Sequence, residues 1–377
     1  MAPQQQKNRL YFIKTYGCQM NGADSAKLAG VLEAYGYQAM KRENKNDSNI
    51  RGLEICDFIL VNTCVVRQNA EDRAAGYIAS LKGLKAKNPD LKIALCGCYV
   101  TEPGRDVTKQ FPHVDLFLGP GQPEKLKEFL TALASVPSPR GRGGQAKHQR
   151  VRAKEGLVTI MTGCDNYCSY CVVPYVRGRE SSRPIPEVLE EIKQLLDRGA
   201  TAITLLGQNV NSYTFGLAEL LRQIGSAIHD PQSTIHFLTS HPRDMSDEIV
   251  AAVHELPYVA KEFVMPLQSG DDEILAKMNR GYTFEHYLER VNKIRALLPG
   301  ARITTDILVG FPGETEEQFQ NTLQAIKTIS FAEVHMFAYS RRPETAAAKR
   351  PDQLPEQIKT ERLNRLIKTV RGIVKKT

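Results

Sequence analysis

Short apolar runs rich in β-branched residues recur along the first part of this 377-residue chain, and helix-like stretches separate them. Four of these runs are predicted to be strands, at residues 9–17, 56–64, 92–98 and 114–119. Continuous apolar strands that alternate with amphipathic helices are typical of a parallel sheet covered on both faces. We therefore predict that residues 8–135 form an α/β domain with a Rossmann-like parallel sheet.

A second series of apolar runs begins at about residue 155. Six strands are predicted there, at residues 156–163, 202–208, 234–240, 262–268, 302–311 and 333–340. Six strand–helix units are too few for a closed eight-stranded barrel, so the pattern predicts a partial (β/α)6 barrel over residues 155–345, with ligand-binding loops at the carboxyl ends of its strands. Pro184 and Pro186 suit the start of the first long helix, and Gly199 suits its end.

The positive charge of the chain, formally +8, is concentrated in two stretches. Residues 136–154 are predicted to be a basic linker rich in Pro, Gly and Arg, and residues 346–377 a basic helical extension. The basic side chains of the linker are Arg140, Arg142, Lys147, Arg150, Arg152 and Lys154. A polyanionic partner such as nucleic acid explains this distribution, and a solvated linker and tail is the simpler alternative.

From the apolar content of the sequence, no targeting signal for a membrane or an organelle is expected. No stretch approaches the roughly 20 apolar residues that a membrane helix needs, and the start, MAPQQQKNRL, has neither an apolar core nor the character of a transit peptide. A cytoplasmic location without a membrane partner is therefore predicted. In such a reducing compartment, cysteines more often bind metals or take part in catalysis than form disulfides.

Three of the eight cysteines lie within the segment GCDNYCSYC. Cys164, Cys168 and Cys171 have the spacing C-x3-C-x2-C and directly follow the first strand of the second domain. Three thiolates suit a [4Fe–4S] cluster with one iron left open. Structural zinc needs four ligands, and only a fold that brings His241 or His148 close would supply the fourth. The polar residues between the thiols make an inert, buried triplet the weakest of the three interpretations.

Three further cysteines, Cys18, Cys64 and Cys98, stand at the ends of predicted strands of the first domain. Strand ends of a parallel sheet meet at one edge, so these thiols can converge although they are far apart in sequence. Gly17 and Gly97 precede two of them and allow a close backbone approach. This arrangement predicts a second three-thiolate cluster, and unrelated small apolar cysteines are the alternative. Buried positions inside strands are predicted for the remaining two, Cys56 and Cys96.

The C-x3-C-x2-C segment after the first strand of a partial barrel resembles the signature of radical S-adenosylmethionine enzymes. Together, the two triplets resemble the methylthiotransferase branch of that superfamily, over residues 9–350. The segments YGCQMN, CSYCVVPYVRGRESSRP, LLGQNVN, TSHP, PLQSGDD and DILVGFPGE are similar to those of the tRNA-2-methylthio-N6-dimethylallyladenosine synthases.

This resemblance implies two [4Fe–4S] clusters and S-adenosylmethionine as cofactors. The open iron beside Cys164, Cys168 and Cys171 would chelate S-adenosylmethionine, and an electron would release a 5′-deoxyadenosyl radical from it. The radical would take hydrogen from adenine C2 of an isopentenylated adenosine beside the tRNA anticodon. Sulfur held at the Cys18, Cys64 and Cys98 site would fill the vacancy, and a second S-adenosylmethionine would methylate it.

The same resemblance implies particular partners and leaves other substrates open. The expected partners are the tRNA anticodon loop, an electron donor such as flavodoxin or ferredoxin, and a sulfur donor that the sequence does not identify. The same chemistry on threonylcarbamoyl-adenosine or on a ribosomal-protein aspartate is one alternative. A non-enzymatic, metal-stabilised RNA-binding protein is the other.

Further site residues are carried over from the matching segments. Cofactor contacts are expected from Gly207, Gln208, Asn209, Ser240, Arg243 and Gln268, and a catalytic position is expected for Asp306, which points into the barrel. A plain strand-end turn at Gly207 and a surface ion pair at Arg243 are the respective alternatives. Ser269 is expected to line the cavity with Gln268, and Glu314 to cap the following helix. Arg177 and Arg183 are expected to meet either RNA phosphate or carboxylates.

Two features depart from the family pattern. The family usually has a segment close to ARPGTPA where this chain has RRPETAAA, so Glu344 and Ala346 replace Gly and Pro. An altered turn near the substrate is expected from this change. The β-rich TRAM domain that normally follows is not found before Thr377. Weaker tRNA affinity is expected as a result, partly offset by the basic linker and tail.

Overall fold

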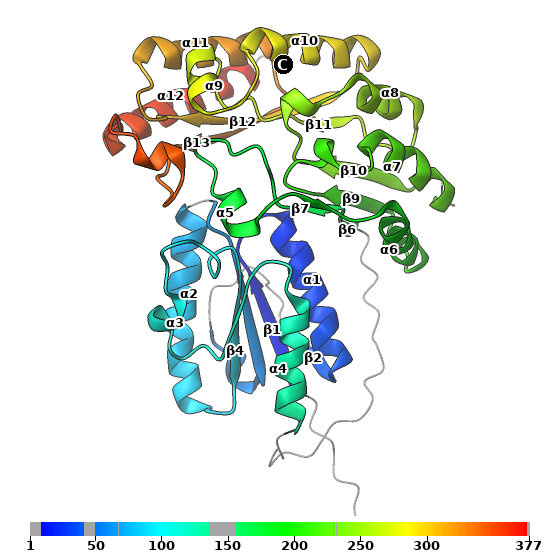
Figure 1. The fold of residues 1–377 in the computed structure, drawn as a ribbon, viewed down its shortest axis with the longest axis vertical. Helices are drawn as coiled ribbons and strands as arrows, with labels where there is room; N and C mark the ends of the chain where they lie inside the picture. Colours follow the sequence, from blue (N-terminus) through cyan, green and yellow to red (C-terminus); the bar gives the residue numbers. More distant parts are fainter. Residues whose placement is uncertain are drawn as a thin grey trace, which may run out of the picture. The chain divides into compact units, whose positions relative to one another are not determined.

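The computed structural model describes residues 9–40, 50–66, 68–135, 155–228, 230 and 232–374. The chain divides into two compact units (Figure 1). The first unit comprises the residues up to 151 together with Tyr175–Arg177, and the second comprises residues 152–174 and 178–377. The linker expected at 136–154, with its six basic side chains, lies outside the described residues.

The first unit contains the predicted parallel sheet. Its strands are β1 (Arg9–Thr15), β2 (Tyr37–Ala39), β3 (Phe58–Thr63), β4 (Lys92–Gly97) and β5 (Leu116–Leu118). They pair in the order β2-β1-β3-β4-β5, and every pair is parallel. Sequence analysis missed β2 and made β5 too long. The prediction of a parallel α/β sheet is confirmed.

Helices cover both faces of this sheet (Figure 1). They are α1 (Gln19–Ala34), α2 (Gln68–Lys87), the short α3 (Val107–Gln110) and α4 (Pro123–Ser135), and a 3-10 turn, η1, spans Leu53–Ile55. Leu28 of α1 and Leu126 of α4 share one apolar cluster with Phe58 and Leu60 of β3. All six residues of β3 are buried, because it is the central strand of a sheet covered on both sides.

The second unit contains six parallel strands. They are β6 (Glu155–Thr159), β9 (Ala202–Leu206), β10 (Thr234–Leu238), β11 (Glu262–Val264), β12 (Arg302–Val309) and β13 (Glu333–Ala338). They form two parallel sheets, β6-β9-β10 and β11-β12-β13. Ile235 of β10 links the β6-β9-β10 sheet to the segment that leads into β11, because its N–H donates to the Tyr258 carbonyl (2.8 Å) and its carbonyl accepts from the Ala260 N–H (2.9 Å).

A helix follows each of these strands, so the predicted (β/α)6 arrangement is confirmed. The six helices are α6 (Ile185–Asp197), α7 (Leu217–Ile224), α8 (Asp247–Glu255), α10 (Phe284–Leu297), α11 (Glu316–Ile329) and α12 (Glu356–Val374). Between them lie α5 (Val173–Arg177), α9 (Asp272–Lys277) and an antiparallel pair, β7 (Met161–Thr162) and β8 (Ser181–Ser182). Short 3-10 turns are η2 (Val210–Ser212), η3 (Gly225–Ala227), η4 (Pro242–Asp244) and η5 (Ala346–Lys349).

One large apolar core joins the strands of the second unit to their helices. Leu366 and Val370 of α12 belong to it, so the residues expected as a C-terminal extension form the sixth helix of the barrel. Pro184 is the N-cap of α6, and Gly199 follows the C-cap with a φ of +91°, as the sequence predicted.

Some expected boundaries were wrong. Strand β11 ends at Val264, whereas the apolar run predicted a strand as far as residue 268. Gln268 instead adopts a φ of +71° and makes a single bridge to Ile307. Cys56 precedes β3 and does not lie within it, whereas Cys96 is in β4. Both of these thiols are buried, with 1% exposure.

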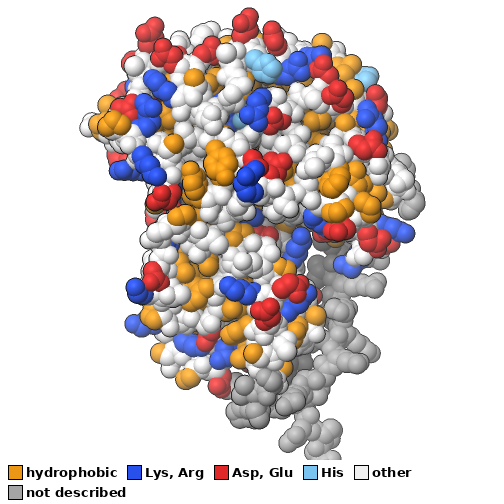
Figure 2. Space-filling model, viewed as in Figure 1, with side chains coloured by type: hydrophobic (Ala, Val, Ile, Leu, Met, Phe, Trp, Pro, Cys, Tyr) orange, Lys and Arg blue, Asp and Glu red, His pale blue; other side chains and the backbone are white. Residues whose placement is uncertain are grey.

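The surface in view carries Lys, Arg, Asp and Glu side chains in alternation, without one extended patch of a single sign (Figure 2). The stretches that contribute most to the positive charge are the linker, outside the described residues, and α12. Of the helices that the structure describes, none has the length and apolar character required to cross a membrane.

Candidate metal centres

The first cysteine triplet lies at the carboxyl edge of the first sheet. Cys18 is the N-cap of α1, just after β1, while Cys64 and Cys98 directly follow β3 and β4. These three strands are neighbours in the sheet, so the structure brings the thiols to one edge. Burial raises the pKa of Cys98 to about 11, and the nearby Cys64 and Cys18 thiols contribute to this shift.

Two glycines allow neighbouring backbone segments to approach one another closely at this edge of the sheet. Gly17 has a φ of +141°, and a Cβ atom at this position would lie 2.7 Å from the Cys64 Cβ. Gly97 has a φ of +101°, and a Cβ atom there would lie 2.2 Å from the carbonyl oxygen of Thr63. Other residues would be both strained and in steric conflict at these positions. The glycines therefore set the positions of Cys18 and Cys98.

A buried amide network that sequence analysis missed supports the same edge. Asn21 Nδ2 donates to Asn62 Oδ1 (3.0 Å) and to the Thr63 carbonyl (2.9 Å), and Asn62 Nδ2 donates back to the Asn21 carbonyl (2.8 Å). Asn21 Oδ1 also accepts from the backbone N–H of Cys18 (3.3 Å). The network thus ties the start of α1 to the end of β3. Asn21 occurs in the YGCQMN segment, which is the signal that would have identified it.

Arg177 belongs to the first unit and lies beside its thiols. Its side chain is 4% exposed and pairs with Asp24 at 3.2 Å. Burial opposes its charge, but the Cys98 thiol and Asp24 raise its pKa overall. In the second unit, Arg183 pairs with Glu191 at 2.5 Å. Of the two roles expected for these arginines, the structure shows the carboxylate contacts.

The second triplet lies on the loop that follows β6 and β7. Cys168 is buried, while Cys164 and Cys171 are half-buried. The Cys171 N–H donates to the Cys168 carbonyl at 2.9 Å. Burial raises the pKa of Cys171 to about 12, with a further contribution from Cys168, and burial also raises the pKa of Cys164. The three thiols are therefore close enough to influence one another electrostatically.

Residues 277–280, which sequence analysis did not select, hold this cysteine loop in place. Ser169 donates from Oγ to the Lys277 carbonyl (2.8 Å) and from its backbone N–H to the Met278 carbonyl (2.9 Å). Asn279 Nδ2 donates to the carbonyls of Asn166 and Tyr167, both at 3.1 Å. Asn279 and Tyr167 both have positive φ, at +57° and +46°. Such strained conformations cluster at functional sites, where the surroundings enforce them.

Five of the six residues expected to contact a cofactor lie after the carboxyl ends of β9 and β10, whereas Gln268 lies after β11 and donates from its N–H to the Asp306 carbonyl at 2.9 Å. Asn209 accepts from the His241 N–H (3.0 Å) and donates to Asp244 Oδ2 (2.7 Å), so it connects the two strand ends. A Cβ atom at Gly207 would lie 2.5 Å from Met161 Cγ, which leaves no room for a side chain. The Oε1 atom of Gln208 is buried and has no hydrogen-bond partner among the described residues.

The end of β10 carries further unpaired polar atoms. In the described part of the chain, neither Ser240 Oγ nor the two ring nitrogens of His241 have a hydrogen-bond partner, although all are buried. Burial lowers the pKa of His241 to about 3, and Arg280 adds to this effect. Arg243 donates to Asp244 (2.8 Å) and to Asn166 Oδ1 (2.6 Å) in the cysteine loop. The ion pair that was the alternative for Arg243 is therefore present, with its neighbour Asp244, while its contact with a cofactor stays a prediction.

The side chains of Asp306 and Glu314 have different surroundings in the barrel. Ile303 and Ile307 of β12 belong to the core shared with the helices. Successive side chains of a strand point to opposite faces, so Asp306, directly before Ile307, faces away from the helices. Glu314 does not cap α11, because the N-cap is Thr315. Its carboxylate instead accepts from Arg362 of α12 at 2.7 Å, in a pair whose side chains are 0% and 7% exposed.

The chemistry of the donors suits the cofactors that the resemblance implies. No three His, Cys, Asp or Glu side chains of the described ranges lie close enough to share one metal ion. In a [4Fe–4S] cluster each thiolate binds a different iron, so the thiols need not converge on one metal ion. Three thiols at one sheet edge and three on one loop are therefore suitable donors for two such clusters. Buried polar atoms without partners at the ends of β9 and β10 suit a polar ligand such as S-adenosylmethionine.

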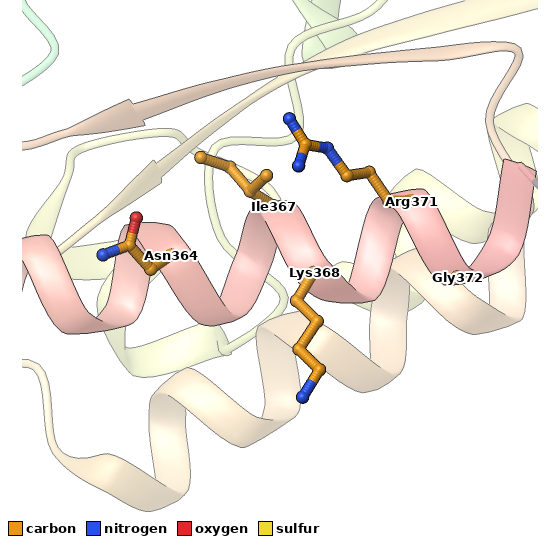
Figure 3. A pocket seen from close by; sticks show the side chains of 5 residues that line it. All are labelled: Asn364, Ile367, Lys368, Arg371 and Gly372. Atoms are coloured by element: carbon orange, nitrogen blue, oxygen red, sulfur yellow. The ribbon is translucent and has the colours of Figure 1, made fainter.

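A separate hollow of about 450 Å³ lies along α12. It is lined by Asn364, Ile367, Lys368, Arg371 and Gly372. Figure 3 shows that Ile367 and Arg371 point to one side of the helix and Lys368 to the other. Because its lining contains no thiol, carboxylate or histidine, this hollow belongs to neither cysteine site.

Known protein families match a segment in each of the two units. A family model described as the Radical SAM superfamily matches residues 158–326, and one described as Uncharacterized protein family UPF0004 matches residues 10–119. The solved structure of the radical S-adenosylmethionine methyltransferase TsrM from Kitasatospora setae has a TM-score of 0.66 at 17% identity, and covers 91% of this chain and 77% of its own. At that identity the likeness concerns the fold. The barrel and its three-cysteine loop thus define a radical S-adenosylmethionine protein.

Sequence relatives specify the family further. The tRNA-2-methylthio-N(6)-dimethylallyladenosine synthase of Clostridium beijerinckii is 42% identical over 392 residues, which are 98% of this chain and 82% of the relative. That of Acetivibrio thermocellus is 42% identical over 385 residues, or 98% and 78%. The chain belongs to this family of radical S-adenosylmethionine methylthiotransferases.

Proposed function

We propose that this protein inserts sulfur and then transfers methyl at adenine C2 of N6-dimethylallyladenosine next to the anticodon of tRNA. The observation that carries the proposal is the presence of two three-thiol sites, one at the carboxyl edge of each parallel sheet system. Relatives that share two fifths of the sequence are named for this product. The likeness includes both units, since it extends over 98% of the chain.

Two triplets would hold the two [4Fe–4S] clusters, Cys164, Cys168 and Cys171 in the second unit and Cys18, Cys64 and Cys98 in the first. When bound, the clusters and S-adenosylmethionine supply the electron, the radical chemistry, the sulfur and the methyl group. Because each triplet supplies three thiolates, a cluster bound there would have one iron without a protein thiolate. Such an iron would be available to a substrate sulfur or to the amino-acid group of the cofactor.

The residues around the second-unit thiols bind and orient the reactants. Ser169 and Asn279 fix the cysteine loop through four hydrogen bonds of 2.8–3.1 Å. Ser240 Oγ and the His241 ring present unpaired polar atoms, which a bound ligand satisfies. Because the pKa of His241 is lowered to about 3, its ring is neutral at pH 7 and has one donor and one acceptor nitrogen. Asp306 provides a carboxylate on the barrel face opposite the helices.

The proposed partners follow from this substrate. An adenosine in the anticodon loop is single-stranded, so its extrusion into a pocket costs little. The phosphate contacts would come from the basic residues of 137–154 and from Lys368 and Arg371 of α12. A low-potential electron donor such as flavodoxin or ferredoxin and a separate sulfur donor complete the set, and the expected compartment is the cytoplasm.

Two measurements test the function. Anaerobic reconstitution of the full chain should give about eight irons per protein, as expected for two [4Fe–4S] clusters. About one zinc without sulfide would favour a metal-stabilised RNA-binding protein instead. Expression in a strain that lacks its own enzyme should restore the methylthio derivative of N6-dimethylallyladenosine in tRNA digests, measured by mass spectrometry. Restoration of a threonylcarbamoyl-adenosine product alone, or of a modified ribosomal-protein aspartate, would reject the proposed substrate.

A further inference from the structure

One buried arginine of the second unit directly contacts a candidate cluster ligand. Arg280 follows α9 and is 4% exposed. Its Nη1 donates to Cys168 Sγ at 3.2 Å, and its Nη2 donates to the Pro266 carbonyl at 2.9 Å. Tyr282 OH accepts from Nε at 3.0 Å, and Tyr170 OH lies 3.4 Å from Nη1. The guanidinium is therefore fixed in orientation against the cysteine loop.

This cation has no acidic partner in the described part of the chain. None of the carboxylates of those residues lies within 4.0 Å of the Arg280 guanidinium. The two phenols that contact the guanidinium, Tyr170 and Tyr282, are neutral groups near pH 7, because an ordinary phenol ionises only near pH 10. A buried charge costs several kcal/mol unless an opposite charge compensates it. The surroundings of Arg280 thus lack an anion that its burial requires.

Among the contacts that the described residues make with Arg280, only Cys168 becomes anionic when metal binds, because thiolates, and not thiols, are the ligands of iron. A [4Fe–4S] cluster held by three thiolates is itself negatively charged, and the charge increases when the cluster takes up an electron. Net charge and hydrogen bonds to the sulfurs are two of the factors that set the reduction potential of such clusters. Both act through Arg280 if the cluster is bound here.

We propose that Arg280 is the fixed counter-charge of the cluster held by Cys164, Cys168 and Cys171, and that it raises the reduction potential of this cluster. The guanidinium stabilises the reduced state more than the oxidised state, because it faces one more negative charge after reduction. Arg280 is a positioning residue, since it acts through the Cys168 sulfur. The inference rests on the proposed function, which supplies the cluster.

The test measures potential and not turnover. The full chain carries Cys18→Ala, Cys64→Ala and Cys98→Ala, so that one cluster remains, and is reconstituted without oxygen. Redox titration followed by electron paramagnetic resonance is then compared for Arg280, Arg280→Lys and Arg280→Met. We expect Arg280→Met to lower the equilibrium constant for reduction at least tenfold, a shift of about 59 mV for a one-electron couple. Arg280→Lys keeps the charge and should shift the constant less than threefold.

Two controls separate this role from a structural one. Arg302→Lys changes an arginine of the same unit whose side chain is 60% exposed and should leave the potential unchanged. In the metal-free chain, denaturant unfolding should show Arg280→Met to be at least as stable as the parent, because the uncompensated cation is gone. A metal-free variant that is clearly less stable, or a bound cluster with an unchanged potential, would overturn the inference. A parent chain that binds no iron would instead remove the proposed function itself.

Discussion

In the first unit the candidate ligands Cys18, Cys64 and Cys98 follow three different strands, whereas in the second unit the triplet occupies one loop of eight residues. The first site exists only when β1, β3 and β4 are paired, because each thiol is placed by its own strand. The second site depends on a loop and on the contacts that residues 277–280 make with it. One site is a property of a whole sheet, and the other of a local segment.

The two sites also differ in how charge is compensated. Arg177 in the first unit is buried beside Cys98 and pairs with Asp24 at 3.2 Å. Arg280 in the second unit is buried beside Cys168, and no carboxylate of the described residues pairs with it. A cation that already has an acidic partner contributes little net charge to its neighbours. A cluster in the second unit would therefore experience a stronger positive field from Arg280 than a cluster in the first unit would from Arg177.

The largest expected effects come from removing one ligand of each triplet. Cys98→Ala and Cys168→Ala should each reduce methylthio-nucleoside formation about a thousandfold or more, and each should remove about four of the roughly eight irons. Only Cys168→Ala should also abolish reductive cleavage of S-adenosylmethionine, measured as release of 5′-deoxyadenosine. The buried but non-ligating Cys56→Ala should keep all the irons. Loss of cleavage in a folded Cys98→Ala protein would show that the two sites are not independent.

Replacing a glycine at the carboxyl edge of the first sheet should lower the free energy of unfolding more than replacing a glycine in an open turn. Gly97→Ala combines a φ of +101° with a Cβ atom 2.2 Å from the Thr63 carbonyl, and should lower the free energy of unfolding by about 3 kcal/mol. Gly104→Ala, at a φ of +77° with no atom within 4 Å, should cost only about 1 kcal/mol. Denaturant unfolding of the metal-free chain measures both. Equal costs for the two would mean that close strand approach does not determine this edge.

The end of β10 should make stability depend on pH. The folded pKa of His241 is lowered to about 3, first by burial and then by Arg280, with Arg243 adding to the effect and Asp244 opposing it. Below the ordinary pKa of about 6.5, the unfolded chain therefore binds a proton that the folded chain does not, and stability is lost as pH falls. Between pH 7 and 5 this amounts to about 2 kcal/mol.

The replacement His241→Phe should remove that part of the pH dependence from the metal-free chain. The exposed His335→Gln serves as the matched control, because its side chain is 45% exposed. Urea midpoints at pH 7 and pH 5 are compared for the three proteins. If the parent and His241→Phe lose stability equally on acidification, the buried ring is not the cause.

The smallest effect concerns the departure from the family pattern in RRPETAAA. Glu344 has a φ of +65°, which is the left-handed conformation that a glycine adopts without strain. Glu344→Gly should relieve about 1 kcal/mol of strain, offset in part by the greater freedom of the unfolded chain, for a net gain of about 0.5 kcal/mol. Glu344→Ala keeps the strain and should give no gain. Thermal unfolding distinguishes the two variants, and equal stability would show that the turn is unstrained.

Local patterns were enough to predict the strand–helix alternation and the strand-end positions of the thiols. Hydrophobic periodicity determines which segments become strands, and a parallel sheet then places all their carboxyl ends together. Strand β2 was missed because its three residues, Tyr37–Ala39, are too few to show a period. The end of β11 was misplaced because an apolar run continues beyond the last paired residue.

Contacts between distant segments could not be predicted. Arg280 reaches Cys168 across 112 residues, and Asn279 reaches Tyr167 across the same separation. No sequence pattern around Arg280 indicates a thiol as its partner, and none around Asn279 indicates the carbonyls that it contacts. Glu314 was expected to cap a helix because it precedes one, yet its carboxylate pairs with Arg362, 48 residues further along. The cofactor contacts of Gly207, Gln208, Asn209, Ser240, Arg243 and Gln268, and the catalytic position of Asp306, stay predictions.

The sixth helix determines where the barrel can be trimmed. A fragment that stopped at residue 345 would lose Leu366 and Val370 from the common core and would leave Glu314 enclosed without the guanidinium that neutralises it. Such a shortened protein should precipitate or aggregate during purification, because an apolar groove and a lone carboxylate would be uncovered together. A minimal catalytic fragment of this enzyme therefore has to include α12.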